Sequence, residues 1–175
     1  MGKASQFYFT RHTMRLSVII PTRNRARSLK KLLPSLDAVE YPDSVLVECL
    51  IVNNCSSDGT GELLATEKSE SRKFSFQVLD EQRKGKASAL NLALASVKGA
   101  VLLIVDDDVI VHPQLFRRHL ECYDRMNFDA VQGRILPGID PEGKAADLER
   151  LREYNIPYID YGDEFREIRG LTCGR

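Results

Sequence analysis

The sequence predicts an α/β fold, in which a mainly parallel β-sheet is flanked by helices. Short, continuously apolar runs rich in β-branched residues have the length and composition of strands that are covered on both faces. Segments with apolar residues at helical spacing separate these runs. Right-handed crossovers leave few other topologies for this alternation, so the strands are expected to pair in parallel.

The first two strand–helix pairs follow directly from this pattern. Residues 16–20 (LSVII) form an apolar run that Pro21 ends, and the leucines after Asn24 recur at helical spacing. Residues 45–52 make the second predicted strand. Asp58 is suited to cap the free amides of the helix that begins there.

The alternation continues through two further pairs. Residues 74–78 alternate between apolar and polar side chains, and residues 87–97 have apolar positions at helical spacing. Residues 101–105 are apolar throughout, which predicts a strand covered on both faces. A fourth helix is expected from Pro113, and residues 129–136 are expected to form a fifth strand.

Three regions follow from these elements. Residues 1–14 are expected to be a poorly ordered extension, residues 15–136 the α/β core, and residues 137–175 a less regular region with one helix at 145–154. A chain of 175 residues is long enough for one domain to bury its core without disulfides or structural metal.

Composition excludes several classes of protein. The formal net charge of zero argues against a nucleic-acid partner, which requires a broad basic surface. Four cysteines without Cys-x-x-Cys spacing indicate reduced thiols, so a cytoplasmic protein is expected. No apolar run reaches the ~18 residues of a membrane-spanning helix, so any membrane association is expected to be peripheral.

Polar residues follow each of the first four predicted strands. In open parallel sheets ligands bind beyond the carboxyl ends of the strands, so these loops are expected to build one pocket. The residues are Pro21, Thr22, Arg23, Asn24 and Arg25 after the first strand, Asn53 to Asp58 after the second, Arg83 to Lys86 after the third, and Asp106, Asp107 and Asp108 after the fourth.

The acidic triplet is the sharpest chemical signal. Three adjacent carboxylates repel one another unless a cation lies among them. Mg²⁺ and Mn²⁺ prefer oxygen ligands, and alternate residues of an extended chain point the same way, so Asp106 and Asp108 are expected to bind a metal. Asp106 and Asp107 are also candidates for substrate contact. A solvated turn or a helix cap is the alternative interpretation of the triplet.

The basic turn before the third helix is a candidate phosphate site. Lys84, Gly85 and Lys86 offer positive charge and backbone amides at a helix start, although lysines are common in turns. Asn91 lies one turn further on, and is either a ligand contact or a buried amide with satisfied hydrogen bonds. His112 and His119 are expected to be structural or surface residues, with His112 entering the fourth helix.

Four successive runs carry a family resemblance. LSVIIPTRNR, LIVNNCSSDGT, RKGKASALNLAL and LLIVDDDV resemble the motifs of family 2 glycosyltransferases, which have the GT-A fold. The order and spacing of the runs are more specific than any one motif. The resemblance implies a Rossmann-like, nucleotide-sugar-binding GT-A core over residues 15–136 and the beginning of an acceptor-side region over residues 137–175.

The resemblance also implies roles around the donor nucleotide. Pro21 and Thr22 match a loop that lies against the nucleotide. The position of Asn53 usually holds an aspartate that contacts the base, and Asp58 supports the same pocket. An asparagine at position 53 keeps an acceptor but adds donors and removes charge, which leaves the identity of the base open.

The remaining motifs match the diphosphate and its metal. Residues 85–91 match a segment that flanks the donor, and Asp106 and Asp108 match the Asp-x-Asp that holds Mn²⁺ or Mg²⁺ on the diphosphate. The implied reaction, part of polysaccharide biosynthesis, transfers a sugar from a nucleoside-diphosphate sugar, expected to be UDP-linked, to a hydroxyl of a carbohydrate or lipid-linked acceptor. Inversion of the anomeric centre and a carboxylate base are expected.

The base itself is not assigned by the resemblance. In the family the base and the acceptor-site motifs lie downstream of the residues that resemble 169–174, and so beyond Arg175. The chain is therefore expected to bind a donor but to transfer sugar poorly. The weaker candidates for a substitute base are Asp160, Asp163, Glu164 and Glu167.

Three alternatives share parts of this pattern. A sugar nucleotidyltransferase would have a Gly-rich phosphate loop after the first strand, where this chain has Pro-Thr-Arg-Asn-Arg. A phosphatase of the haloacid dehalogenase type would place its Asp-x-Asp after the first strand. A non-catalytic nucleotide-binding module would keep the donor loops without transfer.

Overall fold

The computed structural model describes residues 14–43, 45–69, 74, 76–126, 129–133 and 135. Predictions about residues 1–13 and 137–175, including the helix at 145–154 and the four substitute bases, lie outside this description. The chain divides into two units, Met1–Arg118 and His119–Arg175, so the boundary falls inside the predicted 15–136 core. Within the described residues no helix is long and apolar enough to cross a membrane.

The first unit contains a four-stranded sheet in which every pairing is parallel. The strands are β1 (Met14–Thr22), β2 (Val45–Asn54), β3 (Phe76–Glu81) and β4 (Val101–Ile104), in the order β3-β2-β1-β4. This arrangement confirms the predicted α/β class. Met14, which the sequence places in the extension, is the first residue of β1.

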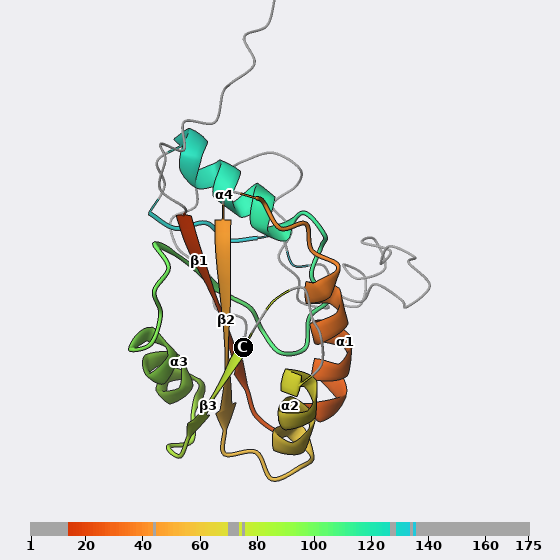
Figure 1. The fold of residues 1–175 in the computed structure, drawn as a ribbon. Helices are drawn as coiled ribbons and strands as arrows, with labels where there is room; N and C mark the ends of the chain where they lie inside the picture. The colour runs from red at the N-terminus through yellow and green to blue at the C-terminus, as the bar shows by residue number, and fades with distance from the viewer. Residues whose placement is uncertain are drawn as a thin grey trace, which may run out of the picture. The chain divides into compact units, whose positions relative to one another are not determined.

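Helices cover both faces of the sheet. Figure 1 shows α1 (Ala26–Asp37) and α2 (Thr60–Ser69) on one face and α3 (Lys86–Leu94) on the other. A fourth helix, α4 (Leu115–Met126), spans the boundary between the units. The helix α1 buries Leu29, Leu32, Leu33 and Leu36, the leucines whose spacing predicts it.

The core beneath α3 depends on small side chains. Ala89 and Ala93 are fully buried against Ile19, Leu50 and Val52 of the two central strands. Alanine allows the helix to approach the sheet closely while the strands supply the apolar volume. This packing fixes the N-terminus of α3 near the carboxyl ends of β1 and β2.

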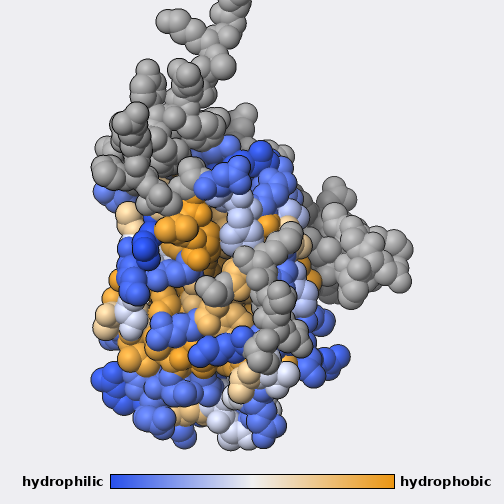
Figure 2. Space-filling view, in the orientation of Figure 1, coloured by the Kyte–Doolittle hydropathy of each residue, from blue (hydrophilic) through white to orange (hydrophobic). Residues whose placement is uncertain are grey.

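The strand β4 differs from its prediction. A strand covered on both faces is expected from its composition, but Leu102 is 39% and Ile104 is 52% exposed. In the described part of the sheet β4 has a partner on one side, β1, and α3 packs on the other three strands. Figure 2 shows an apolar region bordered by hydrophilic side chains on the face of the molecule that it presents.

The predicted fifth strand is also wrong. Residues 129–133 contain no strand, and Ile135 forms an isolated bridge. Asp129 and Gly133 are poor strand formers, and they interrupt an apolar stretch too short to compensate for them.

Candidate functional site

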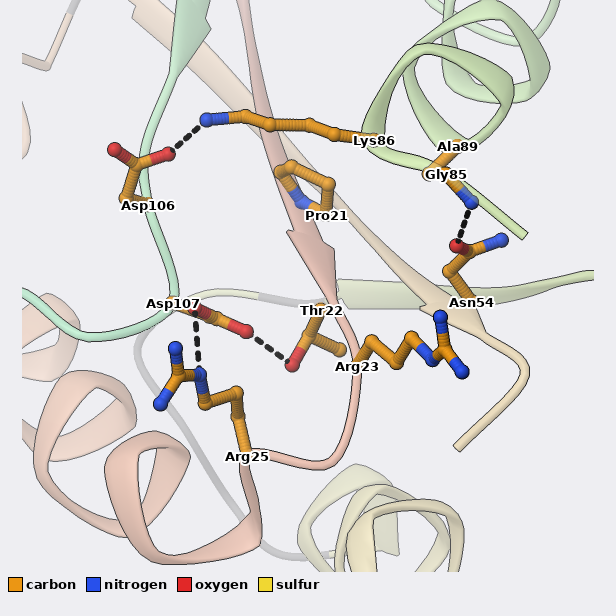
Figure 3. Close-up of a pocket in the computed structure, with 10 residues that line it drawn as sticks. All are labelled: Pro21, Thr22, Arg23, Arg25, Asn54, Gly85, Lys86, Ala89, Asp106 and Asp107. Carbon is orange, nitrogen blue, oxygen red and sulfur yellow. Dashed lines mark hydrogen bonds and ion pairs between the residues drawn. The ribbon is translucent and has the colours of Figure 1, made fainter. Parts of the chain in front are cut away.

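A cavity of about 270 Å³ lies at the carboxyl ends of β1 and β2, next to the start of α3 and the loop after β4. Figure 3 shows the residues that line it. They are Pro21, Thr22, Arg23, Arg25, Asn54, Gly85, Lys86, Ala89, Asp106 and Asp107. The parallel sheet thus brings together residues from all four predicted loops.

Asn24 lies in the loop after β1 and bonds to the loop after β2, outside the cavity lining. Its backbone is left-handed, with φ of 54°, a conformation that asparagine tolerates better than most residues. Its side-chain oxygen accepts a hydrogen bond from the amide of Ser57 at 2.7 Å, and its own amide donates to the hydroxyl of Ser56 at 3.0 Å. Asn24 therefore joins the loops after β1 and β2 and does not line the cavity.

Asp58 has a similar bridging role. One carboxylate oxygen accepts the amide of Thr60 at 2.9 Å, which confirms the predicted cap of α2, and the other accepts the amide of Ala26 at 3.4 Å. The hydrogen bond from the Thr60 hydroxyl is the main reason that the pKa of Asp58 lies below its usual value. Asp58 does not line the cavity, but it supports the loop that carries Arg23 and Arg25.

Each carboxylate of the acidic triplet has a cationic or hydroxyl neighbour. Lys86 Nζ lies 2.5 Å from Asp106 Oδ1. Arg25 Nε lies 3.8 Å from Asp107 Oδ1, and Arg25 Nη2 lies 3.9 Å from Asp108 Oδ2. The hydroxyl of Thr22 donates a hydrogen bond to Asp107 Oδ2 at 2.7 Å. The repulsion expected among the three aspartates is therefore relieved by side chains from the end of β1, the loop that follows it and the start of α3.

Asp107 is the most constrained of the three carboxylates. Burial is the main cause that raises its pKa, and the neighbouring charge of Asp108 raises it further. The hydroxyl of Thr22 and the guanidinium of Arg25 oppose this shift. The Asp107 side chain thus lines the cavity in a fixed orientation, directed toward Thr22 of β1.

Asp106 and Asp108 offer the carboxylate oxygens that a hard divalent cation prefers, and Asp106 lines the cavity whereas Asp108 does not. Their side chains are 38% and 54% exposed, and the contacts made to them come from the long side chains of Lys86 and Arg25, which can move aside. The described residues contain no group of three or more acidic, histidine or cysteine ligands. Mg²⁺ in phosphate sites usually takes one or two carboxylates and completes its shell with phosphate and water, so two carboxylates are sufficient.

The two asparagines at the end of β2 point to opposite faces of the sheet. Asn53 donates to Asp80 Oδ1 at 2.9 Å and lies beside Gly61 of α2, so the structure does not place it in the cavity. Asn54, which the sequence interpretation does not single out, is 3% exposed, lines the cavity and accepts the amide of Gly85 at 2.7 Å. Alternation along the strand is the sequence signal that distinguishes the two residues.

Other predicted residues lie outside the cavity lining. Lys84 and Asn91 are exposed, so the buried-amide interpretation of Asn91 is wrong, and a binding role for either residue stays a prediction. His112 accepts the amide of Gln114 at 3.2 Å, which agrees with a role at the helix entry. His119 is buried, and burial lowers its pKa, as expected for a structural histidine.

Comparison with known proteins identifies the family. The family Glycosyl transferase family 2 matches residues 17–173. Glycosyltransferase AglE of Haloferax volcanii is 32% identical over 120 residues, which cover 69% of this chain and 39% of AglE. The poly(ribitol-phosphate) beta-N-acetylglucosaminyltransferase TarS of Staphylococcus aureus is 27% identical over 133 residues, covering 71% of this chain and 22% of TarS.

Solved structures share the fold. TarS 1-349 of S. aureus in complex with UDP has a TM-score of 0.58 at 25% identity, covering 71% of this chain and 38% of TarS 1-349. Its complex with UDP-GlcNAc has a TM-score of 0.55 at 26% identity, with 71% and 37% covered. The mannosyltransferase PcManGT of Pyrobaculum calidifontis, in complex with GDP-Man and Mn²⁺, has a TM-score of 0.56 at 24% identity, with 74% and 36% covered.

This chain spans about two fifths or less of the length of AglE and TarS. The family match nevertheless extends over most of the present sequence. The solved structures that share the four-stranded parallel sheet are those of glycosyltransferases such as TarS. The chain belongs to glycosyl transferase family 2 and has the GT-A fold.

Proposed function

We propose that this chain binds a UDP-linked sugar in the cavity and serves its transfer to an acceptor hydroxyl, with metal assistance and inversion at the anomeric carbon. The observation that carries the proposal is the meeting of Asp106 and Asp107 with Arg25 and Lys86 at one end of the sheet. A nucleoside diphosphate bound through a divalent cation needs both signs of charge side by side.

The choice of donor draws on similar proteins. TarS, a member of the fold at about one quarter identity, has been crystallised with UDP and with UDP-GlcNAc. Family membership also favours transfer of a sugar over the nucleotidyltransferase and phosphatase alternatives. The acceptor, carbohydrate or lipid-linked, and the cytoplasmic location stay predictions.

The residues of the cavity divide the work by their chemistry. Asp106 and Asp108 would hold the cation, which when bound neutralises charge on the departing nucleoside diphosphate. Lys86 and Arg25 carry positive charge beside these two carboxylates. They would stabilise the negative charge that develops on the oxygens of the departing diphosphate. Asp107, fixed by Thr22, would keep Arg25 oriented toward the cavity.

The base specificity of the cavity provides the test. With Mn²⁺ present, UDP is expected to compete with a fluorescent uridine nucleotide at least about tenfold better than GDP, because a pocket that hydrogen-bonds one base leaves polar groups unpaired with another. Equal competition by the two nucleotides would remove the uridine assignment. Release of UDP from UDP-GlcNAc on addition of acceptors would separate an enzyme from a non-catalytic nucleotide-binding module.

A further inference from the structure

The segment that follows the acidic triplet is held to α1. The backbone amide of Val111 donates to the hydroxyl of Ser35 at 3.2 Å, and the same hydroxyl donates to the carbonyl of Leu32 at 2.7 Å. Ser35 belongs to α1, and Val111 is buried. Figure 1 shows the chain between β4 and α4 passing beside α1. One side chain thus joins this segment to the helix.

The two contacts of Ser35 require a hydroxyl group. A hydroxyl can donate one hydrogen bond and accept another at the same time, which an apolar side chain cannot do. Without it, the buried amide of Val111 would lose the partner that the structure gives it, and an unpaired buried amide is unfavourable. Ser35 therefore fixes the backbone of the segment at Val111.

Further contacts hold the far end of the segment, where α4 begins. Glu40 donates its amide to the carbonyl of Pro113 at 2.8 Å, and its carboxylate lies 3.3 Å from Arg117 Nη2. The ring of Tyr41 meets that of Phe116 edge-on, with the centroids 5.3 Å apart. Of all these contacts, the one from Ser35 lies nearest in the sequence to the acidic triplet.

The near end of the segment is fixed at Asp107. Thr22 donates its hydroxyl to Asp107 at 2.7 Å, and Figure 3 shows Asp107 directed toward Thr22. Asp108 is held less firmly, because its side chain is 54% exposed and its ion pair with Arg25 is long, at 3.9 Å. Asp108 therefore lies between two fixed points, Asp107 and Val111.

The chain between Asp108 and Val111 is short. Three residues cover at most about 10 Å even when fully extended. Ile110, which lies between them, is 55% exposed and gives the backbone little support of its own. Release of Val111 from α1 would therefore allow the backbone of Asp108 to move, whereas Asp107 would keep its bond to Thr22.

We propose that Ser35 is a positioning residue for the cation that the acidic triplet would hold. It acts through the amide of Val111 and sets the place of Asp108 relative to Asp106. This inference rests on the proposed function. It adds a residue of α1 that lies outside the cavity lining to the groups on which metal binding depends.

Removal of the hydroxyl tests this role. In Ser35→Ala the apparent affinity for Mn²⁺, titrated in the presence of UDP, should be about fivefold weaker than in the parent. Ser35→Thr keeps the hydroxyl and should stay within about twofold of the parent. Ser28→Ala removes another half-buried hydroxyl, two turns earlier on the same side of α1, and should bind Mn²⁺ like the parent.

A second measurement separates positioning from stability. Amide hydrogen exchange at Val111, measured without metal or nucleotide, should accelerate in Ser35→Ala and not in Ser35→Thr or Ser28→Ala. Leu64→Val loosens the buried side of α2, and it should lower the free energy of unfolding without changing the affinity for Mn²⁺. A loss of affinity in Leu64→Val equal to that in Ser35→Ala would assign the effect to stability and refute the positioning role.

The outcomes separate this inference from the proposed function. If the parent binds neither UDP nor Mn²⁺, the proposed function fails and the inference fails with it. If the parent binds both but Ser35→Ala keeps the parent's affinity for Mn²⁺, or Ser35→Thr is weakened as much as Ser35→Ala, the positioning role of Ser35 is refuted and the proposed function stands.

Discussion

Lys86 of α3 and Arg25 of the loop after β1 compensate the acidic triplet, and under the proposed function Lys86 has two alternative partners. Its ammonium group contacts Asp106, one of the two carboxylates proposed to hold a metal. A cation at Asp106 would displace Lys86, which would then be free to bind a phosphate oxygen of the donor. Lys86 would therefore oppose binding of the bare metal and favour binding of the nucleotide.

Replacement of Lys86 should separate these two effects. In Lys86→Met, Mn²⁺ alone is expected to bind several-fold more tightly because a competing positive charge is removed, whereas UDP in saturating Mn²⁺ should bind about tenfold more weakly. Titration of free Mn²⁺ by electron paramagnetic resonance and of UDP by calorimetry measures the pair. Lys30→Met, on the exposed side of α1, serves as the control. Shifts of both affinities in the same direction would contradict the exchange of partners.

Single residues are also where prediction from the sequence reached its limit. The acidic triplet and the loop after β1 are identifiable because each follows a strongly apolar run. The Gly85 turn is identifiable because a helical pattern begins directly after it. Alternation along β2 places its two adjacent asparagines on opposite faces, but the sequence does not fix which of them faces the cavity, because a shift of one residue in strand register exchanges the two faces of the sheet. The structure turns Asn54 to the cavity and Asn53 to Asp80.

At the scale of elements, the helices and strands of the first unit follow from local periodicity. The leucines of α1 and the apolar runs of β1 and β2 contain enough consecutive signal to specify the element and its buried face. The poor strand formers Asp129 and Gly133 account for the absence of a strand at 129–133. The exposure of β4, in contrast, depends on the elements that lie beside it. Such neighbours come from tertiary packing, which no local pattern encodes.

The junction between α3 and β4 offers a test of element packing. Gly99 donates its amide to the hydroxyl of buried Ser17 at 2.8 Å, and a Cβ at position 99 would lie 2.6 Å from the Ser17 amide nitrogen and 3.0 Å from the Arg15 carbonyl. Because the contacts include backbone atoms, β1 would have to shift. Gly99→Ala is expected to lower the free energy of unfolding by about 2 kcal/mol or more.

The same substitution at Gly59 is the matched control for this prediction. A Cβ there meets nothing within 4 Å, so Gly59→Ala should change stability by less than about 1 kcal/mol. Urea unfolding followed by circular dichroism measures both variants. Equal stability of the two would show that the close approach of Gly99 to β1 is not a constraint on the fold.

At the scale of the whole molecule, the sheet assembles one site from distant parts of the sequence. Residues near positions 22, 54, 85 and 106 meet because parallel strands end at the same edge. Three of these four regions are held to one another by the contacts of Asn24, Asn54 and Asp58, and of these three residues Asn54 also lines the cavity. A bound nucleotide would therefore meet a largely preformed donor pocket.

Calorimetric titration of UDP measures whether this pocket binds a nucleoside diphosphate through a cation on Asp106 and Asp108, as proposed. The parent should bind UDP with Mn²⁺ and lose that binding in EDTA. Asp108→Ala should weaken Mn²⁺-dependent binding at least about tenfold without unfolding the protein, whereas Asp43→Ala, which removes an exposed carboxylate elsewhere, should bind like the parent. Equal UDP affinity of Asp108→Ala and the parent in Mn²⁺ would rule out Asp108 as a ligand of the cation.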